Sequence, residues 1–266
     1  MPELPEVETI KRALEQIIAG KKITGVIVHN AKVIKEPSLI LFKKGIKGQI
    51  IKRIVRKGKA LILELSSGKS LAIHLRMTGQ LVYPGTGLKS RVSFVLSNKK
   101  LLDYNDQRLL GELKLVSNWR DIPFIKKLGP EPHDLTVKQF SSMLSKKTTK
   151  IKPLLMDQGF IAGIGNLYAA EVLFKSKINP MRKALSLSGA EKRKLFFAIK
   201  DILSKAIKHR GSSIDQYVMV SGRQGDYVRF HKVYDRKDEA CYICRTPIKR
   251  VVCGGRGTYF CGRCQK

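Results

Sequence analysis

Acidic residues are scarce in this chain of 266 residues, which has 21 Asp and Glu against 52 Lys and Arg and a formal net charge of +31. A field of that size destabilises a compact protein unless a polyanion neutralises it, so most enzymes of small metabolites are excluded. Residues 1–130 carry 25 basic and 10 acidic residues, and residues 131–266 carry 27 and 11. The excess of positive charge is therefore spread over both halves and is not confined to a basic tail. It indicates that both halves bind the same polyanion, and nucleic acid is favoured over an anionic membrane surface.

Long apolar runs, internal repeats and low-complexity segments are also missing. No run approaches the roughly 18 residues of a membrane span. The first ten residues hold three glutamates and no apolar core, so we expect no signal peptide. The chain has five cysteines. In a chain without a secretion signal, cysteines are more often metal ligands than structural disulfides.

Hydrophobic periodicity predicts a strand-rich first half. Val7, Ile10 and Leu14 recur at helical spacing behind Pro5, which suits a first helical turn, so a helix opens the chain. Short runs rich in Ile, Leu and Val follow, separated by Gly, Ser and Pro. They predict the strands of a β-sandwich or barrel at 50–56, 60–65, 70–75 and 91–97.

Beyond residue 120 the pattern changes to that of helices. Two capping boxes and one tight turn before a helical run at 167–174 predict a small bundle over 130–210: Thr136 to Gln139, Ser188 to Glu191 and Gly163-Ile-Gly-Asn166. Residues 211–229 are typical of a loop, and short strands around cysteines complete the chain. The length itself predicts about two domains.

The cysteine spacing is the strongest local signal. Cys241-x2-Cys244 is followed, after sixteen residues, by Cys261-x2-Cys264, the spacing of a zinc ribbon. Four thiolates complete a tetrahedral Zn²⁺ site and leave no open position for catalysis, so the predicted zinc is single and structural. Cys253 falls outside the pattern, and we expect a free thiol there.

The Met1-Pro2 start carries a second chemical signal. Loss of Met1 would leave Pro2 with a secondary amine whose reference pKa is about 8, far below that of a lysine. Such an amine is a nucleophile at neutral pH that can attack a sugar C1′ and become an iminium. Glu3 would lie beside it as acid or base. Many proteins begin with Met-Pro, so the dipeptide alone does not decide the question.

Seven collinear motifs together resemble formamidopyrimidine-DNA glycosylases, the base-excision repair enzymes that share a superfamily with endonuclease VIII. They span residues 2–265 and are MPELPEVET, Arg56-Lys-Gly-Lys59, His74-Leu-Arg-Met-Thr-Gly79, Asp106-Gln-Arg108, Gly163-Ile-Gly-Asn166-Leu-Tyr168, Arg256-Gly-Thr258 and the terminal Cys-x2-Cys-Gln265.

The resemblance implies an α+β fold. It consists of an N-terminal β-sandwich with an N-terminal helix, a C-terminal helix–two-turn–helix bundle, and a four-cysteine zinc β-ribbon. We expect a catalytic sandwich domain at 2–125, a linker at 126–132, a helical domain with a lesion loop at 133–228, and the zinc hairpin at 229–266. The implied protein is cytoplasmic, nucleoid-associated and monomeric, and binds double-stranded DNA holding oxidised bases or abasic sites.

The resemblance also implies an activity. The enzyme would excise oxidised purines such as 8-oxoguanine and formamidopyrimidines through a Schiff base, then cleave the abasic strand by β,δ-elimination as an AP lyase. The catalytic residues that it implies are Pro2 as nucleophile, Glu3 as acid/base, Lys59 for β-elimination and Arg256 for δ-elimination. The DNA contacts that it implies are His74, Met77, Arg91, Arg108, Leu110, Lys152, Asn166 and Tyr168.

The sequence departs from the family pattern at three positions. Members usually have Phe two residues after the arginine equivalent to Arg108, and this chain has Leu110. With Met77, these two residues would fill the gap left by a flipped nucleotide. Arg91 stands where many members have His, and Asp235 replaces a Gly.

Two rival functions remain at this point. An endonuclease VIII-like enzyme would prefer oxidised pyrimidines, but the Leu-Pro-Glu-Val start and the loop at 213–229, long enough to cover a flipped purine, favour the purine substrate. A non-catalytic zinc-ribbon protein that binds nucleic acid would share the charge and the cysteines, yet it has no need of Pro2 and Glu3.

Overall fold

The computed structural model describes residues 1–214 and 216–266 and divides the chain into two compact units. The segment Ile207–Val228, which the sequence placed with the helical half, groups with the strand-rich half. The physical reason is burial, because Tyr217 and Val220 of this segment are part of the strand-rich core. Residue 215 of the predicted lesion loop lies outside the described residues. The first unit is Met1–Lys126 with Ile207–Val228, and the second is Lys127–Ala206 with Arg229–Lys266.

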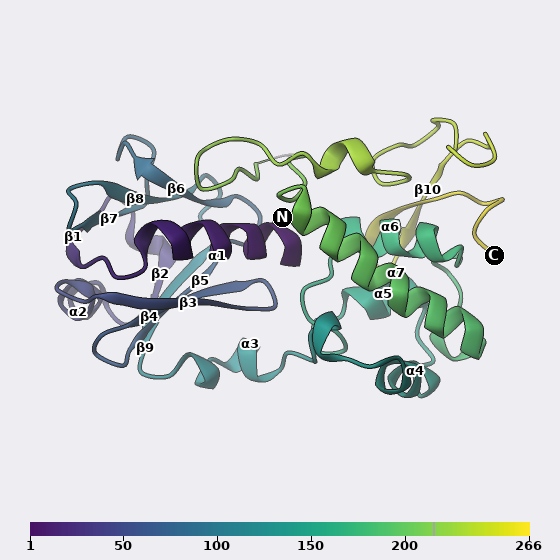
Figure 1. The fold of residues 1–266 in the computed structure, drawn as a ribbon, viewed down its shortest axis with the longest axis horizontal. Helices are drawn as coiled ribbons and strands as arrows, with labels where there is room; N and C mark the ends of the chain where they lie inside the picture. The colour runs from purple at the N-terminus through teal and green to yellow at the C-terminus, as the bar shows by residue number, and fades with distance from the viewer. Residues whose placement is uncertain (215) are drawn as a thin grey trace. The chain divides into compact units, whose positions relative to one another are not determined.

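Two β-sheets form the first unit (Figure 1). One sheet has the strand order β1-β7-β8-β6, and the other has the order β2-β9-β5-β4-β3. Neighbouring strands are antiparallel except β2 and β9, which are parallel. The strands are β1 (Ile23–Val28), β2 (Ile34–Glu36), β3 (Ile51–Lys57), β4 (Ala60–Leu65), β5 (Ser70–His74), β6 (Gly79–Gly85), β7 (Val92–Leu96), β8 (Leu101–Asp106) and β9 (Glu112–Val116).

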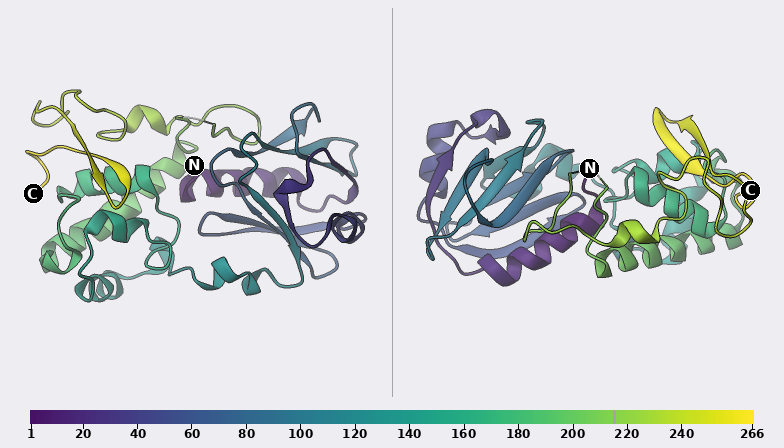
Figure 2. Two further views of the ribbon diagram at one scale, coloured as in Figure 1. Left: turned by 180° about the vertical axis from the view of Figure 1, so that it is seen from behind. Right: turned by 90° about the horizontal axis from the view of Figure 1, so that it is seen from above.

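Helix α1 (Leu4–Ile18) packs on β3 and β4 and closes the core of the first unit (Figures 1 and 2). Its buried residues Val7, Ile10 and Leu14 recur at the spacing that predicted the helix. Each removes apolar side-chain area from water, worth about 1.5–3 kcal/mol for a fully buried aliphatic side chain. Helices α2 (Leu39–Ile46) and α3 (Pro123–Lys126) complete this unit, with single turns at Ala31–Val33 and Trp119–Asp121.

The second unit is a helical bundle with a two-stranded ribbon. Both predicted capping boxes are present, with Thr136 opening α4 and Ser188 opening α7. The helices are α4 (Val137–Ser145), α5 (Ile151–Met156), α6 (Asn166–Ser176) and α7 (Gly189–Lys208), whose last two residues belong to the first unit. The ribbon consists of β10 (Lys249–Cys253) and β11 (Arg256–Phe260), and single helical turns lie at Pro132–Asp134 and Ala184–Ser186. A further turn at Tyr227–Phe230 has its first two residues in the first unit and its last two in the second.

The predicted fold class is confirmed, and the four predicted strands correspond to β3, β4, β5 and β7 within one residue or so at each end. Among residues 1–214 and 216–266, we find no helix with the length and apolar character needed to cross a membrane.

Candidate functional site

The chain start is held at the head of α1. Pro2 is buried and Glu3 is 5% exposed. Glu3 and Glu6 form a capping box, in which the Glu3 carboxylate accepts from the Glu6 N–H and Glu6 Oε2 accepts from the Glu3 N–H at 2.9 Å. Glu6 Oε1 also accepts from the Ser212 N–H at 2.9 Å. The Glu3 carboxylate is therefore fixed next to the residue that carries the candidate amine.

Lys59 lies in the two-residue turn between β3 and β4 and is only 7% exposed. Its turn is fixed by Arg56, which donates through Nη1 to the Gly58 carbonyl at 3.0 Å and through Nε to Glu8 Oε2 of α1 at 2.8 Å. Burial opposes ionisation of Glu8, but the hydrogen bonds from Arg56 and Arg12 outweigh it and hold the pKa of Glu8 below its ordinary value. The helix behind Pro2 and the turn of Lys59 are thus joined by an ion pair.

His74 ends β5 as a neutral imidazole. Its Nδ1 accepts from the Arg76 N–H at 3.1 Å, and its ring meets the ring of Phe124 edge-on at 5.6 Å. Desolvation, with the nearby charge of Arg76, lowers the pKa of His74 to about 4. With Nδ1 engaged as an acceptor, the proton of the neutral ring is on Nε2, which can donate to a phosphate oxygen.

The residues predicted to fill a DNA gap lie on two turns whose flanking strands pair. Met77, between β5 and β6, is 38% exposed, and Leu110, between β8 and β9, is 45% exposed. Arg108 is exposed on the same turn as Leu110. Arg91 donates from Nε to the Asp106 carbonyl at 2.9 Å, at the end of β8. An exposed Met, Leu and Arg beside one another are suited to an unstacked base step.

A polar pair marks the start of α6 in the second unit. Lys152 of α5 is completely buried, and its Nζ donates to Asn166 Oδ1 at 2.5 Å. Gly163 has a φ of 97°, a backbone conformation that favours glycine, in the turn before the helix. The N–H groups at a helix N-terminus favour an anion, and Lys152 adds a positive charge behind Asn166.

Tyr168 is part of the core, since none of its surface is exposed. This burial argues against the predicted direct contact of its side chain with DNA. Arg256, in contrast, is exposed at the start of β11, just after Gly254 and Gly255. The tip of this hairpin packs on Pro153, because a Cβ built on Gly254 would lie 2.8 Å from Pro153 Cγ. The tip therefore lies next to the helix that carries Lys152.

Sequence reasoning missed the buried carboxylate of Glu171. Glu171 of α6 is 1% exposed and accepts from the backbone N–H groups of Lys232, Val233 and Tyr234 at 2.9, 3.0 and 2.8 Å. Burial raises the pKa of Glu171, although the three N–H donors oppose this. A single acidic residue in the otherwise apolar run 167–174 was the signal that could have revealed it.

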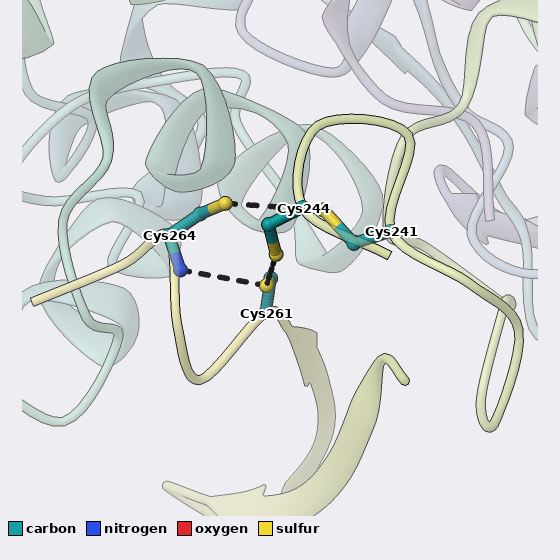
Figure 3. Close-up of side chains that lie close together, drawn as sticks. All are labelled: Cys241, Cys244, Cys261 and Cys264. Atoms are coloured by element: carbon teal, nitrogen blue, oxygen red, sulfur yellow. Dashed lines mark hydrogen bonds between the residues drawn. The ribbon is translucent and has the colours of Figure 1, made fainter. Parts of the chain in front are cut away.

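The four predicted zinc ligands converge at the base of the ribbon (Figure 3). Their sulfur atoms all lie within 4.8 Å of one another, with 3.9 Å between Cys241 and Cys264 and 3.4 Å between Cys244 and Cys261. A tetrahedral zinc with Zn–S bonds of about 2.3 Å requires sulfurs about 3.8 Å apart, so the donor set fits. The distances exceed the roughly 2.05 Å of a disulfide. Cys253 is buried outside this cluster.

Models of protein families match most of the chain. The model of the formamidopyrimidine-DNA glycosylase N-terminal domain matches residues 1–113, and that of the H2TH domain of these enzymes matches residues 128–218. A model of the zinc finger found in FPG and IleRS matches residues 238–266. This last match and the cysteine geometry together establish one structural zinc site.

Curated relatives match over the whole length. The formamidopyrimidine-DNA glycosylase of Desulforamulus reducens is 43% identical over 276 residues, covering 100% of this chain and 99% of the relative. The protein of the same name from Pelotomaculum thermopropionicum is also 43% identical, over 274 residues, with 100% and 99% covered.

Solved structures agree with the sequence relatives. The MutM (FPG) protein of Thermus thermophilus superposes with a TM-score of 0.90 at 34% identity, covering 99% of this chain and 98% of that chain. A variant of Lactococcus lactis FPG in complex with DNA containing Fapy-dG has a TM-score of 0.92 at 36% identity, with both chains fully covered.

Proposed function

Since this chain belongs to the formamidopyrimidine-DNA glycosylase family, we propose that it removes oxidised purines from duplex DNA and cleaves the strand at the resulting abasic site. The observation that carries the proposal is the start of the chain. Pro2 precedes Glu3, the N-cap residue of α1, and the Glu3 carboxylate is fixed by the capping box with Glu6. A protein that only binds nucleic acid has no need of this arrangement.

The amine of Pro2 suits the role of nucleophile. With a pKa of about 8, roughly a tenth of such an amine is unprotonated at pH 7, against about 0.04% of an ordinary lysine at a pKa of about 10.4. Attack of the Pro2 nitrogen on C1′ breaks the bond between sugar and base, and the base leaves with a proton supplied by an acid. The product is an iminium between Pro2 and the opened sugar. Glu3, next to the reacting nitrogen, is the candidate acid and base.

Strand cleavage follows from the iminium. Removal of a proton from C2′ expels the 3′ phosphate, which is β-elimination, and a second elimination expels the 5′ phosphate. We assign Lys59 to the first step and Arg256 to the second. Lys59 is 7% exposed in a turn fixed by Arg56, and a positive charge there favours departure of a phosphate. Arg256 is exposed on the zinc ribbon and free to approach a phosphate.

The remaining polar residues are proposed to hold the duplex. His74 and Arg91 in the first unit, and Asn166 in the second, are assigned to the phosphates. Lys152 would act through Asn166, since Lys152 itself is buried. Met77, Arg108 and Leu110 are assigned to the gap left by the flipped nucleotide, and Tyr168 is assigned to packing. We also propose a monomer located at the nucleoid, a catalytic domain over 2–125 and a zinc hairpin over 229–266. The helical domain is limited to 133–206 in this proposal, because 207–228 group with the strand-rich unit.

Excision from a panel of duplexes tests the proposal. Each duplex holds one lesion, either 8-oxoguanine, a formamidopyrimidine or an oxidised pyrimidine. We expect the purine lesions to be cut faster, and the opposite order would favour an endonuclease VIII-like enzyme. Pro2→Gly should lose excision and borohydride trapping but still bind DNA. A matched control is the enzyme that retains Met1, which keeps Pro2 but acylates its nitrogen and should be equally inactive.

A further inference from the structure

The two turns assigned to the DNA gap are cross-linked to each other. Thr78 Oγ1 donates to Asp106 Oδ1 at 2.5 Å and accepts from the Arg108 N–H at 3.1 Å. Asp106 Oδ2 accepts from the Gly111 N–H at 2.7 Å. Thr78 is 8% exposed and Asp106 is 1% exposed, so these bonds are shielded from water. One carboxylate and one hydroxyl thereby connect the turn after Met77 with both ends of the turn that carries Leu110.

A second link joins the same turns. Arg76, next to Met77, donates from Nη2 to Glu112 Oε1 at 2.6 Å, and Glu112 opens β9 directly after the Leu110 turn. Burial opposes ionisation of Glu112, but the hydrogen bond from Arg76 outweighs it and lowers the pKa of Glu112. The turns are therefore tied by an ion pair at one side and by the Thr78–Asp106 bond at the other.

The backbone of both turns is in a costly conformation. Leu109 has a φ of 55° and Arg76 a φ of 52°, in the left-handed region that residues with a Cβ rarely adopt. A side chain at Gly111 would not fit, because a Cβ there would lie 1.7 Å from Tyr104 Oη. Left-handed conformations such as those of Leu109 and Arg76 persist only where the surroundings over-determine them, and they concentrate at ligand clamps. The cross-links supply that constraint.

We propose that Thr78 and Asp106 are positioning residues that lock the two turns together, so that Met77, Arg108 and Leu110 are presented as one wedge before DNA binds. This inference rests on the proposed function, because it deepens the assignment of these three residues. If the lock is lost, only a fraction of molecules holds the wedge geometry. The apparent Kd for DNA that needs the wedge then rises by the inverse of that fraction.

The matched pair Thr78→Val and Thr78→Ser tests the lock. Valine keeps the shape and removes the hydroxyl, whereas serine keeps it. The probes are a duplex with a tetrahydrofuran abasic analogue and the same modified strand alone. We expect Thr78→Val to bind the duplex about tenfold more weakly, because the variant loses the buried hydrogen bond to the Asp106 carboxylate. Its affinity for the single strand should be unchanged, and Thr78→Ser should bind both probes like wild type.

A control variant separates this effect from loss of any hydroxyl in the sandwich. Thr24 of β1 donates to the Val95 carbonyl at 3.2 Å in the same sheet as β6 and β8. Thr24→Val should keep the ratio of duplex to single-strand affinity. If Thr78→Val does not fold, Thr78→Ala removes the same hydroxyl without bulk.

Amide hydrogen exchange in the free protein tests the Thr78–Asp106 link between the two turns without DNA. The Arg108 and Gly111 amides should exchange at least about tenfold faster in Thr78→Val. Unchanged exchange overturns the lock, whatever the protein binds. The lock is not a positioning device if Thr78→Val exchanges faster but keeps the wild-type ratio of duplex to single-strand affinity. The same conclusion follows if Thr78→Val binds the duplex and the single strand more weakly by the same factor. If wild-type protein prefers no lesion duplex and traps no abasic DNA, the proposed function fails, and the exchange result still decides the lock.

Discussion

Replacement of Glu171 by glutamine should loosen the zinc ribbon. The Glu171 carboxylate accepts from Lys232 through Oε2 and from Val233 and Tyr234 through Oε1. Glutamine has nearly the same size, but its amide nitrogen donates and cannot accept. At least one of the three backbone N–H groups would therefore lose its acceptor in a buried place. Val233 lies in the same buried cluster as Cys241 and Cys261, so the zinc ligands should respond.

The expected magnitude follows from those three bonds. A buried N–H without an acceptor costs about 1–3 kcal/mol. The other bonds change from charge-assisted to neutral, a loss of about 0.5–1 kcal/mol each. A neutral amide also regains part of the cost of burying a charge, a cost visible in the raised pKa of Glu171. We expect a net loss of about 2 kcal/mol in the free energy of unfolding of the second unit.

Urea unfolding followed by circular dichroism measures that loss, and the rate of zinc transfer to a coloured chelator reports the ribbon itself. The matched control is Glu239→Gln, which removes a carboxylate that pairs with Arg236 at 2.9 Å but has a side chain 56% exposed. Exposed pairs contribute about 0–1 kcal/mol, so this variant should resemble wild type. If Glu171→Gln unfolds and releases zinc like wild type, the Glu171 carboxylate does not anchor the segment.

Three further predictions concern the wedge, the metal and pH. Leu110→Phe should bind abasic duplex more tightly, by less than the roughly 1–3 kcal/mol of an aromatic stacking contact, as titration with labelled DNA can measure. Cys244→Ser should lower the zinc content below one per chain and weaken DNA binding by misplacing Arg256, as metal analysis and the same titration can show. Desolvation lowers the pKa of His231 to about 4 in the folded protein. The unfolded chain, in which the pKa of His231 is about 6.5, therefore binds a proton more readily, and the free energy of unfolding falls as the pH drops from about 6.5 toward 4. Between pH 7.5 and 5, wild type should lose about 2 kcal/mol more than His231→Gln in urea unfolding, and equal losses would refute this.

Local pattern predicted much of the architecture. Helix α1, strands β3 to β5 and the two capping boxes depend on residues close in sequence, and they lie where the periodicity placed them. The cysteine spacing was equally informative, because tetrahedral zinc leaves few arrangements for two Cys-x2-Cys pairs. Strands β1, β2, β6, β8 and β9 were not predicted. In β6, Pro84 and Gly85 near the end of the strand are typical of a turn.

Long-range contacts could not be predicted in this way. Thr78 and Asp106 are joined across 28 residues, and Glu171 reaches Val233 across 62. Such pairs depend on strand register and on the path of irregular segments, which periodicity does not encode. The burial of Lys152 and Tyr168 is a similar case, since the family resemblance implied direct contact with DNA for both. The residues that support the site were thus harder to predict than the residues with chemical signatures.

The nucleophile is the central claim, and the position of a trapped adduct tests it most directly. Borohydride would reduce the iminium formed with abasic DNA, and mass spectrometry of the digested complex would locate the modified residue. We predict one adduct, on the N-terminal peptide that begins at Pro2 without Met1, with the sugar remnant on the proline nitrogen. An adduct on Lys59 or another lysine, or no adduct despite strand cleavage, would contradict this account.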